Sequence, residues 1–281
     1  MIGELSSFSN ALLNALTNTL GGKATQLTSW RNTLRASTIV AMVVITIAIL
    51  FNLETLTLRV VAIGIAAGLI GGLGLPLIYQ AFAVGSVSFV SPVVALVQSF
   101  NLILFAVIVE NEKLSWAFPF AALLGVVGLF ACSRTSSTGA SASLKVFGLT
   151  AAAACFFTGF SFLMTLIEAD EIIAALFGGR IGVLLISFIF PPEKRSKERV
   201  ADSPKEWRKY ALLSGTCEIF ANLAFMLAIT NLDLSKVGIF VASAPALASL
   251  IGIKLLKQKP SLINWLGIAA TSAALAIIAI I

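Results

Sequence analysis

The sequence predicts an all-α integral membrane protein, with ten transmembrane helices arranged as two inverted five-helix repeats. Three observations predict this fold: an apolar composition, apolar stretches of membrane-spanning length, and an internal repeat. Of the 281 residues, 58% are hydrophobic and 11% are charged, and the mean hydropathy is +1.00. Soluble domains are only about 45–50% apolar and carry about 25% charged residues. A soluble core of this size cannot bury so much apolar surface, so a membrane is expected to surround the chain.

The apolar stretches divide the chain into its expected helices. A helix that crosses the bilayer needs about 20 apolar residues. Nine clear segments meet this requirement, near 36–52, 58–83, 87–109, 115–133, 145–167, 172–190, 208–230, 235–256 and 261–281. A tenth candidate, near 3–22, is long enough but rich in Ser, Thr and Asn. The connections are short except for residues 191–209, which form a basic, aqueous loop.

The basic residues predict how the chain lies in the membrane. If the segment near 3–22 is the first helix, 15 of the 19 Lys and Arg residues fall in loops on one side, seven of them within 191–209. Cytoplasmic loops carry such an excess. The 191–209 loop is therefore expected in the cytoplasm, with both termini outside. The net charge of +6 then concerns topology and contact with lipid headgroups, and nucleic acid is not an expected partner.

An internal repeat relates the two halves of the chain. The stretch "ENEKLSWAF" at 110–118 and the stretch "LKQKPSLIN" at 256–264 both separate two apolar segments, and they align at an offset of 146 residues. We expect a first repeat at 1–137 and a second at 138–281. The weak segment near 3–22 then matches the clear segment at 145–167, which favours ten helices. Because each repeat has an odd number of helices, the second enters the membrane inverted, as in many secondary transporters.

These spacings resemble the EamA-type family of the drug/metabolite transporter superfamily, whose domain typically occurs as two five-helix copies. In the second half, Pro245 follows Ala228 by seventeen residues, and the charged stretch at Gln258 precedes Gly267 by nine. The first half resembles the family through "SVSFVSPVVAL", "ENEKLS" and Gly128. The resemblance implies a secondary transporter in the cell membrane that exports amino acids, other metabolites or drugs. The alternatives are a membrane channel, a receptor that does not transport, or a lipid-handling protein.

Polar side chains within the apolar segments are the candidate site residues. Asn10, Asn14 and Asn18 are spaced by four residues, so they share one helix face. A row of amides is costly in lipid. It therefore either forms hydrogen bonds between helices or lines a substrate path, and the sequence leaves both open. The other candidates for the cavity wall are Tyr79, Gln80, Gln98, Asn101, Phe157, Glu218 and Asn222.

Glu218 is the carboxylate that most needs an explanation, because it lies deep in the apolar stretch "SGTCEIFANLAFML" at 214–227. Ionisable residues inside a membrane mark functional sites by default. Three roles remain open: coupling transport to protons, attracting a cationic substrate, or pairing with Arg180. Asn222 follows one turn later on the same face, so we expect Glu218 to face a cavity formed by the first, third, fourth, sixth, eighth and ninth helices, near Asn14 and Asn18.

The remaining expectations concern motion and chemistry. Pro92 and Pro245 lie inside apolar segments and are the candidate hinges. The sequence has no histidine, its three cysteines are far apart, and no phosphate-binding loop is present. We therefore expect no enzymatic activity, no metal and no cofactor. The expected partners are a small-molecule substrate and membrane lipid, and the chain is expected to be a monomer or a homodimer.

Overall fold

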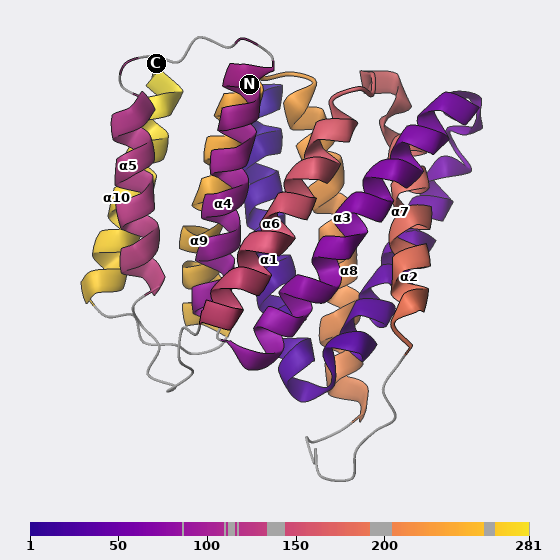
Figure 1. Cartoon of the computed structure of the whole chain (residues 1–281), viewed down its shortest axis with the longest axis horizontal. Coiled ribbons are helices and arrows are strands. Elements are labelled where there is room, and N and C mark those ends of the chain that lie inside the picture. The colour runs from indigo at the N-terminus through magenta and orange to yellow at the C-terminus, as the bar shows by residue number, and fades with distance from the viewer. Residues whose placement is uncertain are drawn as a thin grey trace.

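The computed structural model describes residues 1–85, 87–109, 111, 116, 118–133, 144–191, 204–255 and 262–280. These residues form ten α-helices and two short 3-10 helices, and none of them forms a strand. The helices lie side by side in one bundle (Figure 1). The elements are α1 (Ile2–Leu27), α2 (Trp30–Ile49), η1 (Leu53–Thr55), α3 (Leu58–Val84), α4 (Val87–Ile108), α5 (Phe118–Ser133), α6 (Leu144–Met164), η2 (Ala169–Glu171), α7 (Ile172–Ile189), α8 (Pro204–Ile229), α9 (Leu234–Leu255) and α10 (Leu262–Ile280).

Each expected segment corresponds to a helix, including the weak one near 3–22, which is α1. Three boundaries differ by four residues or more. Helix α1 continues to Leu27 rather than ending near 22. Helix α2 begins at Trp30 rather than near 36, because the Ser29 hydroxyl accepts a hydrogen bond from the Asn32 backbone N–H at 3.3 Å and caps the helix. Helix α8 begins at Pro204, inside the segment expected as a loop. Residues 192–203 of that loop, the stretch at 256–261 and most of "ENEKLS" lie outside the described residues.

Five helices of the described chain are long and apolar enough to cross a membrane. They are α2, α3, α6, α7 together with η2, and α8 from Glu206 onward. Helix α1 has 26 residues but is not among them, because its polar residues lower its hydropathy.

Helix α1 lies antiparallel to α8, with its polar residues against that helix. The Asn10 side-chain amide donates to the Ala221 carbonyl at 2.8 Å, and the Ser214 hydroxyl donates to the Thr17 carbonyl at 3.0 Å. The residue numbers on α8 thus fall as those of their partners on α1 rise, so the two helices are antiparallel. Two polar contacts seven residues apart place α1 beside a helix that can cross the membrane, and they hide part of its polar face from lipid.

Glycines bring α3 into backbone contact with α7. A Cβ atom on Gly68 would meet the carbonyl of Gly179, and one on Gly64 would meet the carbonyl of Ala175. The two helices run parallel, since both numbers rise together. Small residues allow such close approach in membrane helices, where packing replaces the hydrophobic effect as the attraction.

The other face of α3 packs antiparallel against α6. A Cβ atom on Gly71 would lie 2.8 Å from the Cβ of Phe160, and one on Gly74 would lie 2.7 Å from Cε1 of Phe157. The glycines of α3 therefore provide the space into which two phenylalanine side chains of α6 fit.

The set of helix contacts stays the same when each helix is replaced by its counterpart in the other half, α1 by α6 and so on to α5 by α10. Contact α1·α8 corresponds to α6·α3, α2·α8 to α7·α3, and α1·α9 to α6·α4, while α2·α7, α4·α9 and α5·α10 map onto themselves. Helices α5 and α10 form the pair at one edge, and the start of α1 and the end of α10 lie at the same end of the bundle (Figure 1).

Candidate solute cavity

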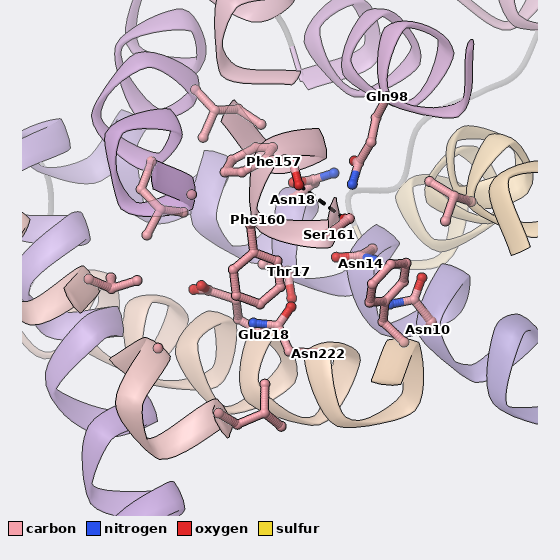
Figure 2. Close-up of a pocket in the computed structure, with 18 of the residues that line it drawn as sticks. Asn10, Asn14, Thr17, Asn18, Gln98, Phe157, Phe160, Ser161, Glu218 and Asn222 are labelled. Carbon is pink, nitrogen blue, oxygen red and sulfur yellow. Dashed lines mark hydrogen bonds between the residues drawn. The ribbon is translucent and has the colours of Figure 1, made fainter. Parts of the chain in front are cut away.

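A cavity lies at the centre of the bundle, between α1, α3, α4, α6, α7, α8 and α9. About 950 Å³ of space separates the surrounding side chains, part of it open to solvent. Figure 2 shows the labelled polar and aromatic side chains around this space. The lining residues are Asn10, Asn14, Thr17, Asn18, Gly71, Leu75, Ile78, Tyr79, Phe82, Gln98, Phe157, Phe160, Ser161, Leu176, Gly179, Arg180, Val183, Glu218, Asn222, Phe225 and Val241.

Most of the residues expected at the cavity wall are there. The structure brings together Asn14, Asn18, Tyr79, Gln98, Phe157, Glu218 and Asn222. Gln80 and Asn101 are not among the lining residues. Asn101 instead donates a hydrogen bond of 3.4 Å to the Thr158 hydroxyl and so links α4 to α6. Adjacent helical residues point about 100° apart, which explains why Gln80 does not accompany Tyr79.

The α1 wall carries the row of amides. Asn10 is 2% exposed, and its Nδ2 donates to the Ala221 carbonyl. This bond fixes the orientation of the amide group, because only nitrogen can donate to a carbonyl. The Oδ1 atom of Asn10 is buried and has no hydrogen-bond partner. Asn10 therefore bonds to α8, the first of the two roles that the sequence left open, and all three amides line the cavity. That the cavity is a substrate path stays a prediction.

An ion pair joins α7 to α8 at the cavity wall. Nη1 of Arg180 lies 2.7 Å from Oε1 of Glu218, and the side chains are 3% and 12% exposed. Both residues line the cavity. The second carboxylate oxygen of Glu218, Oε2, is buried without a partner. Glu218 thus pairs with Arg180, one of the three roles left open by the sequence, and it contributes to the cavity wall as expected.

Helix α7 belongs to the cavity wall, although the expected set of six helices omitted it. Arg180 reaches the cavity because the preceding residue, Gly179, packs its backbone against Gly68 of α3. From the sequence, Arg180 is expected only as a possible partner of Glu218. Thr17 and Ser161 are lining residues that were not expected from the sequence. The spacing of four residues between Phe157 and Ser161 indicates a shared helix face.

Tyr79 lines the cavity, and its hydroxyl is held by a side chain of a neighbouring helix. Its hydroxyl lies 3.2 Å from the Ser37 hydroxyl on α2, and the residue is 3% exposed. A buried Tyr hydroxyl normally needs such a partner. The ring of Tyr79 is therefore held in place at the wall.

The candidate hinges lie within helices. Pro92 is in α4 and Pro245 in α9, and both helices are continuous through these positions. A hinge role for either residue stays a prediction. In the part of the chain that the structure describes, no three His, Cys, Asp or Glu side chains come together in a way that could hold a metal ion.

Comparisons with known proteins agree with the family expected from the sequence. Residues 145–280 match the model of the EamA-like transporter family. No curated protein matches the chain. A solved structure described only as "Crystal structure of protein" is similar to it, with 18% identity and a TM-score of 0.75, over 98% of this chain and 95% of the other. At this identity the likeness concerns the fold alone.

Proposed function

We propose that the chain, whose residues 145–280 match the model of the EamA-like transporter family, is a secondary transporter that moves a small organic solute by alternating access. The observation that carries this proposal is the polar cavity at the centre of an apolar bundle. The solute is an amino acid, another metabolite or a drug, and export across the cell membrane is the proposed direction. The protein acts without a cofactor, as a monomer or a homodimer.

The polar lining of the cavity supports transport, because polar side chains inside a membrane bundle cost free energy unless they contact one another, water or a solute. Ionisable and amide side chains inside a membrane bundle face one another or a water-filled space, where they mark solute pathways. Arg180 and Glu218 satisfy each other only in part, and Asn14, Asn18 and Asn222 surround the same space. Helix packing alone does not need this many polar groups around an open volume.

An inverted repeat of ten spanning helices would supply the two states that alternating access requires. The exchange symmetry of the helix pairs supports this arrangement. So do individual contacts at the offset of 146 residues. The contact of Asn10 with Ala221 has its counterpart, within one residue, in the contact of Phe157 with Gly74. Helix α1, which runs beside α8, is proposed as the first of the ten spans.

The proposed topology places the 191–209 loop in the cytoplasm and both ends of the chain outside. The shared location of the start of α1 and the end of α10 (Figure 1) supports an even number of spans. A cysteine at position 203, in place of Ser203, should resist an impermeant thiol reagent added to intact cells in a background lacking the native cysteines. Labelling of that cysteine would contradict the topology.

Solute counterflow tests the transport proposal most directly. Purified protein in liposomes is preloaded with unlabelled solute from a panel of amino acids, sugars and organic cations, and uptake of the labelled solute is followed. A carrier accelerates uptake when the same solute is inside, because each reorientation returns a loaded site. A channel gives no such acceleration, and an enzyme consumes the solute. Failure of every preloaded solute to accelerate uptake would contradict the proposal.

A further inference from the structure

The two charges in the cavity wall neutralise each other. Among the described residues that line the cavity, only Arg180 and Glu218 carry a charge, and they contact each other at 2.7 Å. A charged solute would add an uncompensated charge to this space, which is unfavourable in a membrane interior. The balance therefore favours a solute without net charge.

The remaining polar groups of the cavity both donate and accept hydrogen bonds. Asn14, Asn18, Gln98 and Asn222 each offer an amide nitrogen and an amide oxygen, and Ser161 offers a hydroxyl. An ammonium group needs acceptors only, and a carboxylate needs donors only. Hydroxyl groups donate and accept at once, so they match amide side chains one for one.

Unpaired oxygens extend along the seam between α1 and α8. Asn10 Oδ1, Thr17 Oγ1 and Glu218 Oε2 are buried without partners, and all three residues line the cavity. Asn10 and Thr17 are seven residues apart on one helix, which corresponds to roughly 10 Å along its axis. A buried acceptor without a partner costs about 1–3 kcal/mol. These buried oxygens therefore leave the hydrogen bonding of the α1–α8 seam incomplete beside the cavity.

Two phenylalanines contribute apolar wall to the same space. Phe157 and Phe160 come from α6, and Figure 2 shows their rings among the labelled amides of α1 and α8. The face of an aromatic ring packs well against C–H groups. The solute therefore needs an apolar face in addition to its row of hydroxyl groups.

We propose that the solute is an uncharged, polyhydroxylated ring compound of the sugar type, with hydroxyls toward the α1–α8 seam and C–H groups toward Phe157 and Phe160. This inference rests on the proposed transport function, because it assigns a solute class to the same cavity.

Three sugars of one size that differ in charge test the inference. Glucose is neutral, glucosamine is a cation and glucuronate is an anion. Binding is measured on protein in lipid nanodiscs, so that no glycoside detergent competes, by the shift of the melting temperature with solute concentration. Glucose should bind at least about tenfold more tightly than either charged analogue, a difference of about 1.4 kcal/mol. Equal or tighter binding of a charged analogue, or no binding of any of the three, would overturn the inference.

A charge added to the cavity should change the preference. Asn14→Asp introduces a carboxylate among the lining residues, so glucosamine should gain on glucose by about tenfold. Asn231→Asp makes the same chemical change at an exposed position outside the cavity and should leave the order of the three sugars as in the wild type. A glucose-to-glucosamine affinity ratio in Asn14→Asp that equals the wild-type ratio would show that the sugars bind elsewhere and would overturn the inference.

Counterflow with the same sugars separates this inference from the proposed function. Glucose binding without glucose counterflow supports the solute class and contradicts transport. Counterflow that is faster with glucosamine or glucuronate than with glucose supports transport and overturns the solute class. Glucose counterflow that exceeds both charged analogues supports both.

Discussion

Two antiparallel crossings occupy equivalent places in the bundle, yet they are built from different residues. Where α1 crosses α8, an asparagine and a serine form hydrogen bonds to the partner backbone. Where α6 crosses α3, phenylalanines fit against glycines. The first crossing contributes amides and a carboxylate to the cavity, and the second contributes aromatic rings. The two halves share a packing plan while they divide the chemistry between them.

The two crossings differ in how much their contacts contribute to the stability of the bundle. Hydrogen bonds between membrane helices contribute about 1 kcal/mol or less each. The polar crossing, that of α1 with α8, therefore gains little stability from its hydrogen bonds. Glycine–aromatic packing fills space closely and leaves few polar groups to satisfy. Substitutions of the hydrogen-bonding Asn10 at the α1–α8 crossing should therefore alter solute handling more than stability, and substitutions at the α3–α6 crossing should do the reverse.

The largest expected effect comes from Glu218→Gln, because it affects the ion pair beside the polar crossing. Arg180 is 2% exposed and would keep its charge without a counter-charge. Breaking a buried pair from one side costs about 3–5 kcal/mol, so the melting temperature should fall strongly. The double variant Glu218→Gln, Arg180→Gln should recover most of the loss. A single variant that melts like the wild type would mean that the pair does not hold α7 to α8.

A smaller loss of stability is expected from Gly71→Ala, which fills the glycine–aromatic crossing. The new Cβ would lie 2.8 Å from the Cβ of Phe160, so the backbone of α6 would have to move. Overpacking of this kind costs about 1–3 kcal/mol. Gly148→Ala on α6 is the matched control, since no atom lies within 4 Å of its Cβ position, and it should melt at or slightly above the wild-type temperature. Equal melting of the two variants would refute tight packing at this crossing.

Asn10→Leu should cost still less stability but more transport. The variant loses the 2.8 Å hydrogen bond to the Ala221 carbonyl, which is worth about 1 kcal/mol or less, and removes an acceptor from the cavity. Counterflow per folded molecule is the measurement. Asn101→Leu is the control, because Asn101 also bonds across helices but does not line the cavity. If both variants lose transport equally, the polar crossing has no special role in solute handling.

The smallest effect is expected at an ion pair far from both crossings. Arg59 lies 3.3 Å from Glu171 at the start of α7, and its side chain is more than half exposed. Exposed pairs contribute about 0.2–1 kcal/mol. Glu171→Gln should therefore shift the melting temperature by a degree or two at most, with unchanged counterflow. A large loss of either would mean that this contact holds the start of α3 to the start of α7.

The presence of the helices was predictable, because the length and composition of each apolar segment determine it locally. Even α1 could be inferred, although only by comparison with its repeat mate. Most of the cavity wall was predictable for a similar reason: lipid excludes amides and carboxylates, so polar residues within apolar segments must face inward. The sequence could not show which of several inward directions each residue takes. Gln98 and Asn101 are about 60° apart around α4, and only Gln98 reaches the cavity.

Helix partners were not predictable from spacing. The polar side of α1 matches α8, some two hundred residues later, and no local pattern indicates that pairing. The place of α7 in the cavity wall follows from Gly179 touching the backbone of α3. Glycines in an apolar helix indicate close approach to some neighbour, but not to which one. Arg180 was recognised only because a charge inside the membrane needs a partner.

The pairing of α1 with α8 also has a consequence for how the protein is made. Helix α1 leaves the ribosome first, with a polar face that lipid does not accept, and the partner that covers Asn10 lies 211 residues further along. At a synthesis rate of about 5–20 residues per second, α8 follows roughly 10–40 s later. During that interval α1 must wait at the insertion machinery or at the membrane surface. Assembly of the bundle is thus completed in an order different from that of translation, and a nascent chain truncated before α8 should leave its first helix uninserted.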